Sequence, residues 1–141
     1  MGNRIIKFRA WDSVSKIMYY QESLTGGAFA DYDISVIIGF DNHAYLLRED
    51  EHGNKIIDDN AGSLIPMQYC GVKDKNGKEI YEGDIDQDGG RIFYNESIAA
   101  FQIDYGGDVD IADMEDVDKW MVVSGNIYES PELLNPLNKQ S

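Results

Sequence analysis

Residues 67–85 have the sequence MQYCGVKDKNGKEIYEGDI, and this stretch decides the fold. Its Asn76-Gly77 step tolerates the positive backbone angle φ of a tight turn, and extended runs stand on both sides of it. The pattern therefore predicts a β-hairpin that joins residues 67–69 to residues 79–81. A second turn at Gly83-Asp84 leads into an apolar strand residue, as is common in small SH3-like barrels.

Toward the C-terminus the sequence predicts three more strands, at residues 91–95, 98–105 and 121–127. Turn residues such as Gly89-Gly90 and Asn95-Glu96 separate them. Strands spaced this closely indicate a small barrel or a curled antiparallel sheet.

Two short helices are predicted in the same half. In the acidic stretch 106–119, apolar residues recur at three-to-four spacing, which favours one helix with its carboxylates outward. These apolar residues are Ile111, Met114, Val117 and Trp120 or Met121. Ser130 is a hydroxyl N-cap candidate ahead of Pro131, which predicts a second short helix that ends before Pro136.

The N-terminal half begins with a predicted hairpin at residues 5–20, where apolar and polar residues alternate. Asp12 favours a turn there, because its carboxylate can accept a hydrogen bond from the backbone two residues on. Residues 21–63 are predicted to be irregular and to contain hairpins. The strand candidates in this region are 34–40, 44–47 and 48–52 with 55–57, and the turn candidates are Gly26-Gly27, Asp41-Asn42 and Gly53-Asn54.

We therefore predict an α+β, mostly β fold of antiparallel strands, with a small SH3-like barrel or curled sheet in the C-terminal half and one or two short helices. The expected division is 1–66, a hairpin plus an irregular strand-containing region, and 67–141, a barrel-like part with a short terminal helix. One continuous domain remains an alternative, since 141 residues suit a single core.

Composition excludes several classes of protein. The net charge of −14 opposes general affinity for nucleic acid. No apolar run approaches the roughly 20 residues of a membrane-spanning helix, and the N-terminus lacks the pattern of a signal peptide. The single cysteine, Cys70, cannot form an intramolecular disulfide and lies in an apolar run, so we expect it to fill a strand in a cytoplasmic protein.

The sequence gives no catalytic, cofactor-binding or metal-binding residues. Residues 84–89 match the first half of a calcium loop, D-x-D-x-D-G, but Asn95 stands where the bidentate acid is required, so an outward-facing strand and a Gly-Gly hairpin are the preferred interpretation. His43 and His52 fit no zinc spacing and are expected on the surface. Neither a nucleophile elbow nor a phosphate-binding glycine loop is present. No cofactor is predicted.

Three segments together resemble the YopX family of phage and prophage proteins. They are residues 6–12 (IKFRAWD), residues 67–85, and residues 125–134 (GNIYESPELL). The resemblance implies a phage or prophage origin, a strand-rich fold with a barrel-like part, and no established biochemical activity, so it supplies no catalytic residues. The residues themselves indicate turn and cap signals in these blocks.

Four functional hypotheses follow. The favoured one is a non-enzymatic accessory protein that acts through protein–protein contacts, homo-oligomers included, because exposed strand edges favour self-association. The main alternative is an acidic decoy of a host DNA-binding protein, which requires the acids between Asp104 and Asp118 to be spaced like phosphates along one face. A third is a nucleic-acid-binding barrel that uses Lys7, Arg9 and Lys16. An enzyme whose site is assembled from distant residues is the fourth.

Overall fold

The computed structural model of the chain describes residues 5–21, 34–39, 41–107 and 110–134. The chain folds into two compact units, which we call the N-terminal unit (Ile6–Gln68) and the C-terminal unit (Tyr69–Ser141 with Met1–Ile5). Strands predominate, and the paired strands of the described residues are antiparallel. The mostly β, antiparallel fold predicted from the sequence is confirmed.

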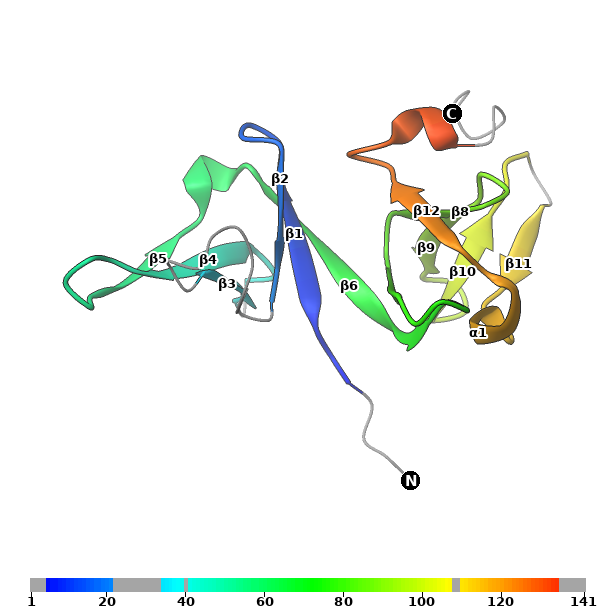
Figure 1. Ribbon diagram of the computed structural model, residues 1–141, viewed down its shortest axis with the longest axis horizontal. Helices are drawn as coiled ribbons and strands as arrows, with labels where there is room; N and C mark the ends of the chain where they lie inside the picture. The colour runs from blue at the N-terminus through cyan, green and yellow to red at the C-terminus, as the bar shows by residue number, and fades with distance from the viewer. Residues whose placement is uncertain (1–4, 22–33, 40, 108–109, 135–141) are drawn as a thin grey trace. The chain divides into compact units, whose positions relative to one another are not determined.

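Two groups of strands build the N-terminal unit (Figure 1). The first is the hairpin of β1 (Phe8–Asp12) and β2 (Ile17–Tyr20), with β1 also paired to the start of β6 (Leu64–Lys73). The second is a three-stranded sheet in the order β3 (Ile34–Ile38), β4 (Ala44–Glu49), β5 (Lys55–Asp58). A 3₁₀ turn, η1 (Asn60–Gly62), leads from β5 into β6.

The core of this unit lies where the hairpin and the three-stranded sheet pack together. Its buried members are Ala10, Val36, Ala44, Leu46 and Leu64, with Tyr19 and Ile38 packed against them. Apolar burial of this kind stabilises the fold by about 25 cal/mol per Å² of surface removed from water.

The C-terminal unit is built on a curled five-stranded sheet in the order β11-β10-β9-β8-β12 (Figure 1). Strand β7 pairs with the later residues of β6. The strands are β7 (Glu79–Tyr81), β8 (Asp84–Asp86), β9 (Arg91–Asn95), β10 (Ala100–Asp104), β11 (Ile111–Asp113) and β12 (Val123–Asn126). Helix α1 (Val117–Trp120) and the 3₁₀ turn η2 (Pro131–Leu133) complete it. Its buried core comprises Ile80, Ile92, Ile103, Val117, Met121 and Val123.

The helix predicted across the acidic stretch is wrong in its first half. Ile111–Asp113 form β11, which pairs with β10 so that Ala112 lies opposite Ile103. Ala112 and Met114 both pack against the core, which is the alternation of a strand. The α-helix begins only at Val117 and has four residues.

The C-terminal helix is a 3₁₀ turn, and Ser130 does not cap it with its side chain. The Ser130 carbonyl accepts the Leu133 N–H instead, at 3.0 Å. The predicted end before Pro136 lies outside the described residues, as do the Gly26-Gly27 turn and the last residue of the 34–40 strand. Within the described residues, no helix is long and apolar enough to cross a membrane.

Candidate interaction site

Three hairpins are closed by the same five-residue turn, D-x-x-G-x, at 50–54, 74–78 and 86–90. In each, the aspartate N–H donates to the carbonyl of the fifth residue at 2.8–2.9 Å, and the glycine N–H donates back to the aspartate carbonyl. The three glycines have φ of +83°, +82° and +81°, a region that favours glycine. In each turn the aspartate Oδ1 accepts the N–H groups of the third and fifth residues.

In the C-terminal unit, the second carboxylate oxygen of these turns reaches another strand or segment. Asp74 Oδ2 accepts the N–H of Val123 on β12 at 2.9 Å, and Asp86 Oδ2 accepts the hydroxyl of Tyr105 at 2.6 Å. Burial alone would raise the pKa of Asp74, but its backbone hydrogen bonds outweigh burial and lower that pKa. Burial, together with the hydrogen bond to Asp86, raises the pKa of Tyr105. The carboxylates of Asp74 and Asp86 thus make hydrogen bonds that hold the strands of this unit together.

Asp12 likewise binds distant segments of the chain in the N-terminal unit. Its carboxylate accepts the Val14 N–H at 2.9 Å, as the sequence predicted, and also the Ser63 hydroxyl and the Asn60 amide, each at 2.8 Å. Burial would raise the pKa of Asp12, but these hydrogen bonds outweigh it and hold that pKa well below its usual range. Residues 51 positions apart are thereby tied together.

The calcium-like stretch 84–89 is accounted for by one of these turns. Asp84 and Asp86 are buried on β8, where Asp84 accepts the Tyr81 N–H at 2.8 Å. Their predicted outward orientation is therefore wrong, because the backbone of the neighbouring turns needs acceptors inside the sheet. Among the residues that the structure describes, no three metal-ligating side chains gather to hold an ion.

The three-stranded sheet of the N-terminal unit has two different faces. Residues directly opposite on antiparallel strands share a face, and Ile37 lies opposite Tyr45 while Leu47 lies opposite Ile57. Tyr45 and Leu47 alternate with the buried Ala44 and Leu46, so these four large side chains lie on the face turned away from the core. We call Ile37, Tyr45, Leu47 and Ile57 the outer apolar face.

Strand β5 forms the edge of this sheet (Figure 1). Among the described residues it pairs with β4 alone, and its Ile56 and Ile57 are 43% and 63% exposed. Its charged ends make exposed ion pairs to β4, Lys55 with Glu49 at 3.3 Å and Asp58 with Arg48 at 3.5 Å. An open strand edge with large exposed apolar side chains is a ready template for pairing with another chain.

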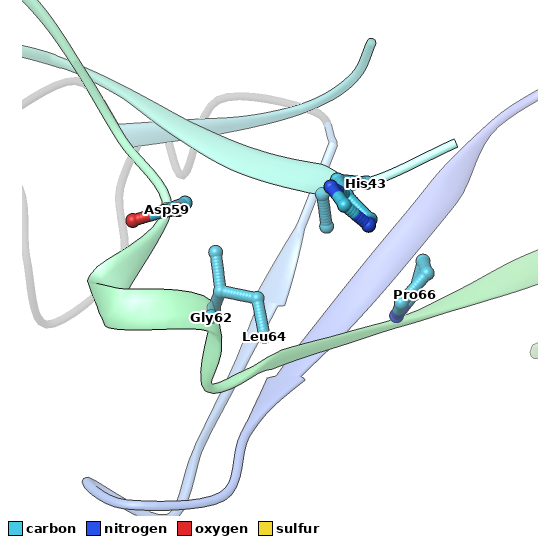
Figure 2. A pocket seen from close by; sticks show the side chains of 6 residues that line it. His43, Asp59, Gly62, Leu64 and Pro66 are labelled. Atoms are coloured by element: carbon cyan, nitrogen blue, oxygen red, sulfur yellow. The ribbon is translucent and has the colours of Figure 1, made fainter. Parts of the chain in front are cut away.

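A small pocket of about 160 Å³ lies near the start of β4 (Figure 2). It is lined by His43, Ala44, Asp59, Gly62, Leu64 and Pro66. The pocket could hold one ring-sized group, but its two titratable side chains do not converge, since the carboxylate of Asp59 points away from His43. This arrangement does not provide an acid–base pair aimed at a bound molecule.

This chain is similar to known proteins in both sequence and structure. The family model described as YopX protein matches residues 7–135. The chain belongs to the YopX family. Similar solved structures are protein EF1440 from Enterococcus faecalis (24% identity, TM-score 0.57, 94% of this chain and 99% of that one) and protein yopX from Bacillus subtilis (22%, 0.58, 91% and 97%). No curated protein sequence matches.

The two histidines and the single cysteine of this YopX-family chain lie close to where the sequence predicted. His43 and His52 are exposed beside Asp41 and Glu51, at 3.4 and 3.5 Å, as predicted for surface histidines. Cys70 is half-buried and packs against the C-terminal core, close to its predicted role as a strand filler.

Arg9 does not contribute to a basic surface on the N-terminal hairpin. Arg9 is 2% exposed, and the last four residues of β1 are all buried, so both faces of this strand are covered. Arg9 is therefore not available to a phosphate backbone, and the nucleic-acid hypothesis loses one of its three cations.

The acids between Asp104 and Asp118 are divided among β10, β11, α1 and the segments between them. Asp104 is half-buried and pairs with Arg91 at 3.7 Å, and Asp116 pairs with Lys119 at 3.5 Å. Asp113 accepts the Gln102 amide at 2.8 Å. Asp108 lies outside the described residues.

Sequence reasoning missed the outer apolar face. It placed strands at 34–40 and 55–57, but both runs are apolar at consecutive positions, so period two could not show which side faces the core. The D-x-x-G-x pattern of the three turns is present in the sequence, but it also occurs at 59–63 and 104–108, so the pattern alone does not distinguish these turns.

Proposed function

We propose that this YopX-family chain is a phage- or prophage-encoded accessory protein that acts in the host cytoplasm through contacts with other proteins and not by catalysis. The observation that carries the proposal is the open edge of β5, where Ile56 and Ile57 are exposed beside the outer apolar face. Large apolar side chains on an unpaired strand edge cost solubility unless a partner covers them. The family resemblance supports the phage origin.

The arrangement of titratable groups supports a non-catalytic role. The buried carboxylates Asp12, Asp74, Asp84 and Asp86 each accept at least one backbone N–H, and most accept several hydrogen bonds. A general acid or base needs a carboxyl group that faces a substrate, whereas these face the turns that they hold. The pocket at His43 offers no converging pair.

The test is partner capture with a matched control. Tagged wild type, Ile57→Glu and Ile98→Glu are used to capture proteins from lysates of phage-infected host cells. Ile98 is 54% exposed in a turn of the C-terminal unit, so it matches Ile57 in residue type and exposure. We expect a stoichiometric partner that Ile57→Glu loses and Ile98→Glu keeps, and whose binding is reproduced with purified proteins.

Two results would count against this proposal. One is partner binding that Ile57→Glu leaves intact, which would move the contact away from β5. The other is turnover of a substrate that is abolished by a single point mutation, which would show an enzyme.

A second candidate, the acidic decoy, is favoured by one observation. Five exposed acids fall within nine residues around β11 and α1, namely Asp110, Asp113, Glu115, Asp116 and Asp118. Neutralising Asp113, Glu115 and Asp118 to their amides should abolish capture of a DNA-binding protein that added DNA also displaces. Neutralising Glu51, Glu96 and Glu129, which lie elsewhere on the chain, is the control. Capture that survives the first set and resists DNA would reject the decoy.

A further inference from the structure

We propose that β5 pairs antiparallel with β5 of a second copy of the chain, centred on Ile57, so that the two outer apolar faces join across a two-fold axis. This inference rests on the proposed function, because it names one partner for the same edge. Homodimers with two-fold symmetry use the same surface on both copies, so an edge strand must be complementary to itself.

Symmetry limits how the two strands can align. Alternate residues of a strand point to opposite faces, and residues directly opposite across an antiparallel pair share a face. In a two-fold pair of identical strands, each residue therefore faces one an even number of positions away. Only four registers are centred within β5, one on each of its four residues.

Charge removes two of these registers. Centring on Lys55 places two lysines directly opposite each other, and centring on Asp58 does the same with two aspartates. Like charges directly opposite destabilise a strand pair. Centring on Ile56 leaves each Lys55 against an isoleucine of its partner, which satisfies no charge.

The register centred on Ile57 is complementary. Ile57 packs against the same residue of the second copy, and each Lys55 lies opposite Asp59 of the other copy, giving two charge pairs around one apolar contact. Ile56 then lies opposite Asp58 on the other face, where Asp58 keeps its pair with Arg48. Lys55 and Ile57 share the outer apolar face with Glu49 and Leu47, which lie opposite them on β4.

Asp59 is placed for this role. It follows β5 directly, one residue beyond Asp58, which lies opposite Leu46 on β4. Its negative charge contributes to the raised pKa of Tyr45, after the hydrogen bond to Asp41 and burial. It is also exposed to solvent.

The contact is small. A strand pair over residues 55–59 buries less than the roughly 1,200 Å² of a stable interface, and the net charge of −14 on each copy opposes association. We therefore expect weak, concentration-dependent dimers that need physiological or higher salt. The Lys55–Asp59 pairs should determine in which register the two strands pair, and they should add little to the affinity of the dimer.

A charge-swap experiment tests the register. Lys55→Glu alone sets two carboxylates opposite each other on both sides of the centre, and Asp59→Lys alone sets two ammonium groups there. Each single variant should therefore associate about tenfold more weakly than wild type. A one-to-one mixture of the two variants restores both charge pairs in the heterodimer, and so does the double variant on one chain. Sedimentation equilibrium and native mass spectrometry measure each case, with circular dichroism to confirm folding.

Two further variants complete the test. Ile57→Glu should abolish association, and Ile98→Glu should leave it unchanged. A monomeric wild type, single variants that dimerise like wild type, or a mixture that fails to form heterodimers would overturn the proposal. A third outcome separates the two proposals. If the wild type is monomeric and captures a partner that Ile57→Glu does not capture, the self-pairing is wrong and the proposed function stands.

Discussion

The turns at 50–54 and 74–78 have the same backbone hydrogen bonds and nearly the same glycine φ, yet their aspartates lie in different surroundings. The Asp50 turn is exposed, and the second carboxylate oxygen of Asp50 accepts the side chain of Asn54 within its own turn. Asp74 is 4% exposed and its second oxygen reaches Val123, 49 residues away. The same local turn therefore makes only local hydrogen bonds at the end of the β4–β5 hairpin, whereas in the C-terminal unit its aspartate also binds the backbone of a distant strand.

Buried aspartates hold distant segments together in both units, and the exposed Asp50 turn is the exception. In the C-terminal unit, polar side chains are turned inward and hold strands together, as Asp74 and Asp86 do. In the N-terminal unit, the sheet that carries the Asp50 turn leaves Ile57 outside. The outward-facing Ile57 on β5 is therefore the feature on which the proposed contact surface rests.

Among the turn substitutions, the largest expected effect is on Asp74. Asp74→Ala leaves the N–H groups of Val123 and Lys78 without these acceptors, which should lower the free energy of unfolding by about 1–3 kcal/mol. Asp50→Ala should cost clearly less, because water replaces its carboxylate. Urea unfolding of the full chain, followed by tryptophan emission, measures both, and equal losses would break the comparison.

The two glycines should behave alike. Gly77→Ala and Gly53→Ala each force a side chain into positive φ, at a cost of about 1 kcal/mol. A Cβ on Gly77 would meet no atom within 4 Å, and one on Gly53 would lie 3.6 Å from Glu49 Oε1, so neither adds a clash. Urea unfolding of both variants measures the two losses. Costs that differ severalfold would show that the turns are not equivalent.

The pH dependence sharpens the role of Asp74. Its pKa is lowered from the ordinary value of 3.8 in the folded chain, so the unfolded chain takes up the proton first as pH falls. The stabilisation is complete above about pH 5 and is lost as pH falls through 3.8 toward the native pKa. The stability difference between wild type and Asp74→Asn should therefore shrink from pH 7 to about pH 3. A constant difference would contradict this.

The smallest expected effect is on β5. Ile57→Thr replaces an exposed apolar side chain on an edge strand with a smaller polar one and keeps β-branching. The free energy of unfolding measured at low protein concentration should therefore change by less than about 0.5 kcal/mol. Ile103→Ala, in the buried core, should cost about 2–5 kcal/mol under the same conditions. A large loss for Ile57→Thr would place Ile57 in the fold itself and not on a contact surface.

Local signals in the sequence predicted much of the framework. The Asn76-Gly77 hairpin and the Gly53-Asn54 turn follow from residues that tolerate positive φ, and both are confirmed. The strand at 91–95 is confirmed with its bounds because turn residues flank it. In each case the deciding interaction lies within a few residues, which is the range over which a sequence pattern is informative.

The errors arose where distant residues decide. Ile111 and Met114 suit a helix by spacing, but β10 offers Ile111–Asp113 a partner strand, and no local pattern shows that. Arg9 alternates with apolar residues as an exposed side chain would, yet both faces of its strand are buried in the folded chain. The outer apolar face could not be assigned for the same reason, since both sides of β3 and β4 are apolar.

The edge of β5 is the proposed contact surface of this protein. Hydrogen–deuterium exchange of the full chain, at low and high protein concentration and again with any captured partner, tests it most directly. We predict slower exchange of the amides at 55–58 when the concentration rises or the partner is added, with the 74–78 turn unchanged. Unchanged exchange at 55–58 in every condition, with new protection elsewhere or none at all, would contradict the claim.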